Sequence, residues 1–278
     1  MENNPEENNE EIVEESNPNF VSKGVRRAID DNAFYHSQSD YVSSSALKSI
    51  AKRSVYHYIN TEPMGPSEAL FIGSAFHTLV LEPHLFNEEF HVAEKIDRRT
   101  KAGKAQAAAL EAELIAQGKM GINKDAYKMI CKMRDNINND PVCSGILQGG
   151  EAEVSFYVED FHGIKVRVRP DYLGKDYIVD LKSCQDASPN LFQKDIYKYG
   201  WKLQAAFYAD VLGMDKFYFL ASEKKSPYQC QLYLMSEKSM EEGRRMYLKS
   251  IEAWKRYIET GFAPKYDHPT LKDGVITL

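Results

Sequence analysis

The spacing of apolar residues divides the chain into a helical first half and a mixed second half. Up to about residue 140, apolar residues recur every three or four positions, which is typical of amphipathic helices. One helix is expected to begin at Ser43 or Ser44, either of which can cap it, and to run to Tyr58. Further helices are expected over residues 67–82, ended by Pro83, over the alanine-rich second part of 94–119, and over 123–140.

From about residue 151 the pattern changes to alternation, which predicts strands. The order of elements predicts an α/β fold, with a mixed central β-sheet flanked by helices. The helical N-terminal half is expected to pack onto this sheet, so that residues 23–278 form a single domain. The expected strands cover 151–159, 163–169, 176–183, 215–222 and 228–235, and the expected helices cover 197–213, with a glycine stop, and 239–260.

The composition predicts an acidic N-terminal tail and no membrane-spanning segment. The 43% hydrophobic content supports a sizeable core, yet no apolar run is long enough to span a bilayer. Residues 1–22 contain seven Glu and no Lys or Arg, so we expect a disordered acidic tail. Removing that charge of −7 from the net charge of −6 leaves +1, which neither favours nor excludes DNA as a partner. No signal peptide is evident, and a cytoplasmic protein is expected.

The four cysteines form no CxxC pair, so their spacing indicates neither a zinc site, a thioredoxin-like motif nor an iron–sulfur cluster. We expect reduced, buried thiols at these positions, which are Cys131, Cys143, Cys184 and Cys230.

The candidate chemistry lies in "RVRPDYLGKDYIVDLKS", residues 167–183. On a strand, Asp180 and Lys182 point to the same face, while Val179 and Leu181 point to the other. Asp171 follows Pro170 where the preceding strand ends, and it approaches Asp180 if the two strands are neighbours. Two adjacent carboxylates repel each other unless a cation lies between them, and a hard ion such as Mg²⁺, or Mn²⁺ in its place, suits oxygen ligands. Lys182 would orient or deprotonate a water, or stabilise developing negative charge.

This arrangement suits phosphodiester hydrolysis, and the pattern P-D followed by D-x-K is the signature of PD-(D/E)xK nucleases. The pattern is short and also arises by chance. The alternative is a surface hairpin whose Asp–Lys pair is solvated. The apolar flanks "YIV" and "L" favour a buried strand instead.

Three further features extend the candidate site. His77 lies on an otherwise apolar helix, where a lone histidine is more often hydrogen-bonded in the core than a ligand. Glu153 opens the first strand and can reach the same metal, although an exposed edge residue is the ordinary alternative. Gln204 and Tyr208 lie four residues apart, on one face of a helix, as ordinary amphipathic spacing would also place them.

From about Tyr41 to the final helix, the chain resembles the RecE-type exonucleases of prophages, also called exonuclease VIII. These belong to the RecB-like branch of the PD-(D/E)xK nucleases. The long block "IGSAFHTLVLEPHLFNEEFHVAEKIDRRTKAGK" is the most specific part of the resemblance. The other matching stretches are "SSSALKSI", "AEVSFY", "VRVRPD", "IVDLKS" and "LQAAFYAD".

The resemblance implies a role for each candidate residue. Lys182 matches the catalytic lysine, and Glu153 matches the acidic residue of the first strand. Gln204 and Tyr208 match the Q-x-x-x-Y motif, which helps to position the lysine and the DNA. The implied metal ligands are His77, Asp171, Asp180 and the carbonyl of Leu181.

The resemblance also implies an activity. We expect Mg²⁺-dependent, ATP-independent digestion of one strand of linear double-stranded DNA, from 5′ to 3′, by a ring-like homo-oligomer, with a tetramer favoured. The 3′ overhang would pass to a RecT-like single-strand annealing protein. Two alternatives remain: another RecB-like nuclease acting as an endonuclease or in repair, and a catalytically silent DNA-binding protein.

Basic and hydroxyl groups in two segments are candidate DNA contacts, although solvated surface charge explains each of them equally well. The helix that begins near residue 44 offers Ser45, Lys52 and Arg53, together with Lys48. The segment "DRRTKAGK" offers Arg98, Arg99, Lys101 and Lys104.

Overall fold

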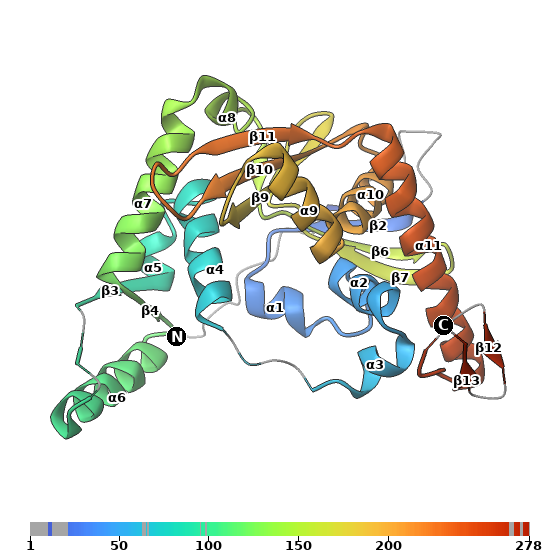
Figure 1. The fold of residues 1–278 in the computed structure, drawn as a ribbon, viewed down its shortest axis with the longest axis horizontal. Helices are drawn as coiled ribbons and strands as arrows, with labels where there is room; N and C mark the ends of the chain where they lie inside the picture. The colour runs from blue at the N-terminus through green and yellow to red at the C-terminus, as the bar shows by residue number, and fades with distance from the viewer. Residues whose placement is uncertain are drawn as a thin grey trace, which may run out of the picture.

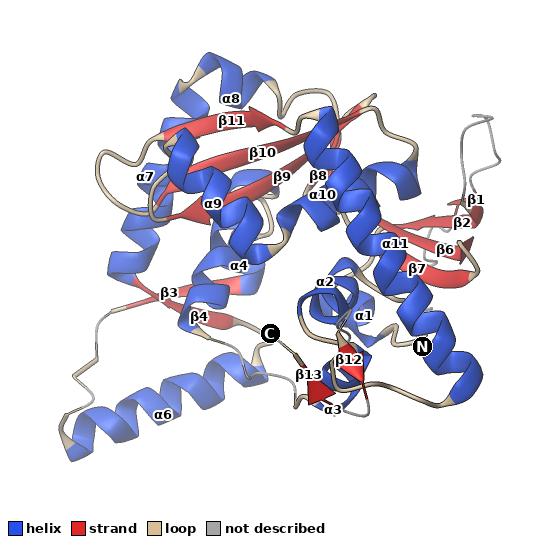
Figure 2. Cartoon of the chain, turned by 45° about the vertical axis from the view of Figure 1, so that its right-hand side comes forward, coloured by secondary structure: helices blue, strands red, loops and turns tan. Residues whose placement is uncertain are grey.

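The computed structural model describes residues 11–12, 22–62, 65, 67–94, 96–97, 99–266, 270–272 and 275–277. It has the predicted α/β architecture, with sheets covered by helices (Figure 1, Figure 2). The strands, however, form two main sheets where one was expected. Among the described residues, no helix is both long enough and apolar enough to cross a bilayer.

The larger sheet has the strand order β11-β10-β9-β8-β5 and is mixed, because β9 and β10 run parallel while the other pairs are antiparallel. Its strands are β5 (Glu151–Ala152), β8 (Tyr172–Leu173), β9 (Tyr177–Cys184), β10 (Lys216–Glu223) and β11 (Cys230–Leu234).

The second sheet is antiparallel and has the order β1-β2-β6-β7. It contains β6 and β7, the two strands that were expected to precede β9 in the same sheet, so the expectation of a single central sheet is wrong in this respect. Two small pairs complete the β-structure. The strands are β1 (Glu11–Ile12), β2 (Lys23–Ala28), β6 (Ser155–Phe161) and β7 (Ile164–Val168), with β3 (Phe90–Ala93) beside β4 (Met120–Asn123) and β12 (Leu271–Lys272) beside β13 (Val275–Ile276).

The predicted helices are present, and most begin at a side-chain cap. Ser67 accepts a hydrogen bond from the Leu70 amide at the start of α4, and Thr100 accepts one from Gly103 at the start of α6. The helices are α1 (Asn32–Ser37), α2 (Ser44–Lys52), α3 (Val55–Asn60), α4 (Glu68–Leu81), α5 (Phe86–Glu89), α6 (Lys101–Ala116), α7 (Lys124–Asn139), α8 (Pro141–Gly145), α9 (Pro189–Tyr199), α10 (Trp201–Leu212) and α11 (Glu237–Thr260).

Two of the expected helices are each divided in two. The helix expected to reach Tyr58 ends at Lys52, because Ser54 accepts a hydrogen bond from the His57 amide and so caps a new helix, α3. Gly200 adopts a left-handed conformation, with φ of 68°, and separates α9 from α10. Within the predicted acidic tail, Glu11–Ile12 pairs with β2 and Ser22 is buried, while residues 1–10 and 13–21 lie outside the described residues.

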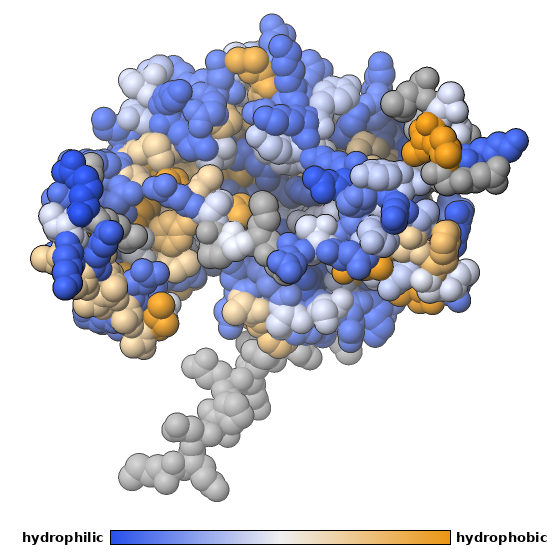
Figure 3. All heavy atoms as spheres, turned by 60° about the horizontal axis from the view of Figure 1, so that its bottom comes forward, coloured by the Kyte–Doolittle hydropathy of each residue, from blue (hydrophilic) through white to orange (hydrophobic). Residues whose placement is uncertain are grey.

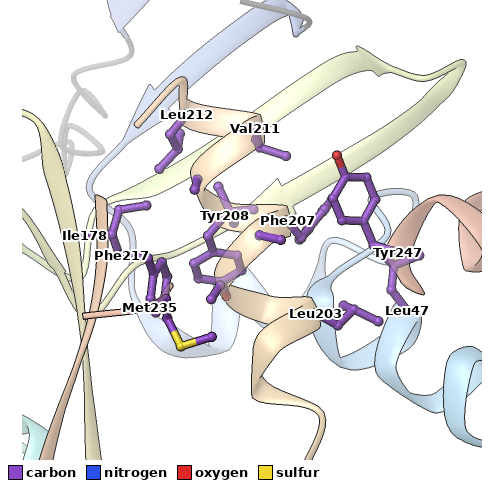
Figure 4. Close-up of a cluster of buried hydrophobic side chains, with 14 of the residues drawn as sticks. Leu47, Ile178, Leu203, Phe207, Tyr208, Val211, Leu212, Phe217, Met235 and Tyr247 are labelled. Carbon is purple, nitrogen blue, oxygen red and sulfur yellow. The ribbon is translucent and has the colours of Figure 1, made fainter. Parts of the chain in front are cut away.

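The larger sheet is buried on both faces. One face carries Ile178 and Phe219 and packs against α10, whose Phe207 also meets Tyr247 of α11 (Figure 4). The other face carries Val179 and Leu181 and packs against α4 and α7. Apolar cores therefore enclose the strand that carries Asp180 and Lys182, and the predicted alternation along β9 is confirmed.

Helix α6 projects from the body of the molecule (Figure 1, Figure 2). In Figure 3, apolar and weakly polar side chains gather at the left of the face shown, where α6 lies. An open groove there is lined by Phe71 and Ile72 of α4, by Leu114 and Ile115 of α6, and by Met120 of β4.

The close crossing of α10 and α11 yields a stability prediction. A Cβ atom on Gly243 would lie 2.1 Å from the Lys202 carbonyl oxygen and 2.8 Å from the Ala206 Cβ. We expect Gly243→Ala to lower the free energy of unfolding by about 1–3 kcal/mol in chemical denaturation, because the helices must separate. The matched control is Gly73→Ala on α4, where a Cβ meets nothing within 4 Å and helix propensity should add about 0.5–1 kcal/mol. Equal effects of the two changes would contradict this account of the packing.

Candidate active site

Three carboxylates lie side by side, one on β9 and the others just beyond the ends of β5 and β8. In the pairing of β5 with β8, Ala152 lies opposite Tyr172, and in that of β8 with β9, Tyr172 lies opposite Val179. One step further along, the same register places Glu153 beside Asp171 and Asp171 beside Asp180. The Glu153 amide donates to the Asp171 carbonyl at 3.1 Å, which confirms the alignment. The predicted proximity of Asp171 and Asp180 is therefore present, although β8, and not β7, is the neighbouring strand.

Asp171 is at the centre of this row. Its Oδ2 accepts a hydrogen bond from the Leu181 amide at 2.7 Å and lies 3.5 Å from Nδ1 of His77. Ligand atoms of His77, Glu153 and Asp171 all lie within 4.8 Å of one another. Helix α4 thus contributes an imidazole, and the sheet contributes two carboxylates, to one partly buried pocket.

The surroundings of Glu153 disfavour its charged form. Burial, followed by the charge of Asp171, raises its pKa from 4.5 to about 9. Its backbone also has a φ of 52°, in the left-handed region that non-glycine residues rarely adopt. The alternation in the sequence suggested that Glu153 opens a strand. It lies instead between β5 and β6. Such strain is common at functional sites.

Asp180 and Lys182 form a buried ion pair on the α10 side of β9. Burial raises the pKa of Asp180 to about 6, although Lys182 opposes the shift. Burial lowers the pKa of Lys182, but Asp180, Asp171 and Glu153 together raise it above its usual value. Oδ1 of Asp180 faces the ammonium and has no hydrogen-bond partner in the described part of the chain.

Gln204 joins this pair to a second lysine. Its Nε2 donates to Oδ2 of Asp180 at 2.6 Å, and its Oε1 accepts from Nζ of Lys48 at 2.9 Å. The two contacts fix the orientation of the carboxamide, and the carboxamide in turn fixes that of Asp180. Burial and then the charge of Lys182 lower the pKa of Lys48 to about 8.

Sequence reasoning missed this position of Lys48. The residue was grouped with the DNA-contacting side chains of α2, whereas its ammonium reaches into the site. Its helical position was visible in the sequence, but nothing local indicates a contact with a residue 156 positions away.

Tyr208, the other residue of the Gln204 pair, lies deeper. It is 7% exposed and hydrogen-bonds with Ser44 of α2 and Tyr35 of α1. Its pKa is raised well above the usual value by burial. The structure therefore places Tyr208 as a bridge between α10 and the start of α2, so that α2 is held along one side of the site.

The donor set fits a hard divalent cation. Carboxylate oxygens from Glu153 and Asp171 and an imidazole nitrogen from His77 converge. Asp180, whose Oδ1 pairs with Lys182, lies beside Asp171. A cation there would relieve the repulsion that raises the pKa of Glu153. The role of the Leu181 carbonyl as a ligand stays a prediction.

The candidate DNA contacts fall into two groups. Ser45 and Arg53 are exposed on α2, and Nζ of Lys52 donates to the Lys198 carbonyl at 2.8 Å. The remaining candidates lie at the N-terminal end of α6, which points away from the body (Figure 1). They are Arg99, which pairs with Asp97, and the exposed Lys101 and Lys104, while Arg98 lies outside the described residues.

The raised pKa of Glu153 predicts a pH-dependent stability. The folded protein keeps a proton that the unfolded chain releases above about pH 4.5, so this group lowers stability as the pH rises from about 4.5 to about 9. In chelator, we expect Glu153→Gln to melt about 3–6 °C above the wild type near pH 8 and at the same temperature near pH 4. Thermal melts at the two pH values measure this. A shift of equal size at both would assign the gain to something other than the proton.

The contacts of Lys48 predict a catalytic effect without loss of fold. Lys48→Met removes the donor that orients Gln204, so we expect nuclease turnover to fall by about 10–100-fold. We expect the melting temperature to hold. Lys48→Arg should recover part of the rate, and Lys128→Met, an exposed lysine of α7, should leave it unchanged. A change in DNA affinity with unaltered turnover would contradict the positioning role.

Comparisons with known proteins identify the family and the fold. Residues 43–268 match the family described as a PDDEXK-like domain of unknown function, DUF3799. A crystal structure from Eubacterium rectale, described as a "putative exonuclease", superposes with a TM-score of 0.57 at 14% identity, covering 88% of this chain and 91% of its own. A phage-related exonuclease from Haemophilus somnus is 10% identical, covers 80% of this chain and 96% of its own, and has a TM-score of only 0.33.

The search of curated proteins finds no match. The family match and the first structure confirm the predicted fold class and the resemblance to the PD-(D/E)xK superfamily. The matched segment contains His77, Glu153, Asp171, Asp180 and Lys182 and spans most of the sequence, so the chain belongs to the PDDEXK-like DUF3799 family.

Proposed function

We propose that this protein is a metal-dependent exonuclease that degrades one strand of linear duplex DNA. The observation that carries the proposal is the convergence of Glu153, Asp171 and Asp180 with His77 and Lys182 in one pocket. Ligands for a hard cation beside a buried amine are what phosphodiester hydrolysis requires. The description of the structural neighbour from Eubacterium rectale, "putative exonuclease", supports the reaction class.

Each group has a distinct part in this proposal. His77, Glu153 and Asp171 would hold Mg²⁺ or Mn²⁺, with Asp180 and the Leu181 carbonyl completing the ligand set. When bound, the ion lowers the pKa of a water and neutralises charge on the phosphate. Lys182, whose ammonium pairs with Asp180, would stabilise the negative charge that develops on the phosphate. Gln204 and Lys48 keep Asp180 turned toward Lys182.

The DNA would approach along α2. Ser45, Lys48 and Lys52 are spaced by three and four residues and therefore lie on one face of this helix, next to the pocket. Ser45, Lys52 and Arg53 would contact phosphates near the cleaved bond. Arg99, Lys101 and Lys104, at the outer end of α6, would contact the duplex further away.

The remaining features rest on the resemblance to RecE-type exonucleases. We propose ATP-independent digestion from 5′ to 3′ by a ring-like homo-oligomer, with a tetramer favoured. The resulting 3′ overhang would be passed to a RecT-like single-strand annealing protein in the cytoplasm of a bacterial host.

The test is digestion of linear duplex DNA labelled at either the 5′ or the 3′ end. We expect the 5′ label to be released first, only with Mg²⁺ or Mn²⁺, and covalently closed circles to remain intact. Lys182→Met should slow digestion by about 10²–10⁴-fold. Asp176→Asn, an exposed carboxylate just before β9, should have no effect.

Other outcomes select the alternatives. Cleavage of closed circles would indicate an endonuclease. Binding of DNA without cleavage in either metal would indicate a silent DNA-binding protein. Undiminished digestion in chelator would exclude the proposed chemistry.

A further inference from the structure

A second cluster of ligating side chains lies outside the candidate active site, where α8 packs against β11 (Figure 1). It consists of Asp140, Cys143 and Cys230, whose ligand atoms all lie within 4.8 Å of one another. Asp140 and Cys143 belong to one turn at the end of α7 and the start of α8. Cys230 comes from the edge strand of the larger sheet.

Local structure fixes two of these residues. Oδ1 of Asp140 accepts hydrogen bonds from the amides of Val142 and Cys143, both at 2.9 Å, and so caps α8. Cys230 begins β11 and pairs with Ser222 of β10. Because the backbone at both places is already ordered, bringing the donors together requires little further loss of entropy.

The side chains also lie close to one another. The Cys143 sulfur lies within 4.8 Å of both an Asp140 carboxylate oxygen and the Cys230 sulfur. Cys143 is 2% exposed, and Cys230 is half-buried. Two thiols and one carboxylate thus converge on one point.

We propose that Asp140, Cys143 and Cys230 bind Zn²⁺, or another thiophilic divalent cation, with water as the fourth ligand. Thiolate and carboxylate are both ordinary zinc ligands, and three protein ligands with one water form a common tetrahedral set. Mg²⁺ prefers oxygen ligands, so the ion proposed for the nuclease pocket would not compete here. Binding replaces the thiol protons and releases them to solvent.

A disulfide explains the cluster less well. It would require the two sulfurs to approach to about 2 Å, and it would not use the proximity of the Asp140 carboxylate to both of them. The zinc site uses all three groups, and the amide hydrogen bonds to Asp140 are the support that metal-binding carboxylates usually have. The ion would fasten the start of α8 to the edge strand of the catalytic sheet.

The test uses Co²⁺ as a spectroscopic substitute for zinc, because thiolate-to-cobalt charge transfer reports sulfur ligands and not the carboxylates of the other pocket. We expect the reduced, full-length protein to develop this absorption with one equivalent of Co²⁺ and to lose it when Zn²⁺ is added. Cys143→Ser and Cys230→Ser should abolish the band. Cys131→Ser, a cysteine of α7 outside the cluster, and Asp171→Asn, in the other pocket, should retain it.

Asp140→Asn weakens the proposed ligand but should keep the fold, since an asparagine oxygen can still cap α8. We expect this variant to melt like the wild type in chelator and to bind Zn²⁺ at least about 10-fold more weakly in competition with a chromogenic chelator. A wild-type protein without the cobalt band would overturn the proposal. So would a band that survives in both cysteine variants, or a Cys143–Cys230 disulfide that forms without any metal binding.

Discussion

Backbone pairing holds three carboxylates close together, although their negative charges repel one another. Glu153, Asp171 and Asp180 share a row because β5, β8 and β9 are hydrogen-bonded in one register. Each strand is fixed by apolar neighbours, so the carboxylates cannot separate without disrupting the sheet. The consequence is that the pKa values of Glu153 and Asp180 are raised, and the packing of the surrounding core offsets the electrostatic cost.

Helix α10 links the apolar core to the candidate active site. Its apolar residues, Phe207 among them, pack between the sheet and α11 (Figure 4). The same packing fixes the position of Gln204, which donates to Asp180. Gln204 is 7% exposed, and both ends of its carboxamide are satisfied. A polar group buried in this way is costly unless all its partners are present, so the network favours a single arrangement of α2, α10 and β9.

The sequence predicts those features that depend on local periodicity. The period of two along β9 places Asp180 and Lys182 together, and the spacing of four along α10 places Gln204 and Tyr208 on one face. It could not predict β8, because two residues are too few to show an alternation. Nor could it predict the contact of Lys48 with Gln204, which depends on the packing of two helices far apart in the chain.

The position of Asp171 shows why a prediction can be correct for an incomplete reason. The sequence suggested that the strand ending before Asp171 pairs with β9, but that strand, β7, belongs to the other sheet. The end of β7 is held by Arg169, whose buried side chain pairs with Asp30, just after β2. Pro170 then has no amide hydrogen with which to continue the ladder, so the chain leaves one sheet and enters the next. Pro170 therefore marks the point at which the chain, and Asp171 with it, passes from one sheet to the other.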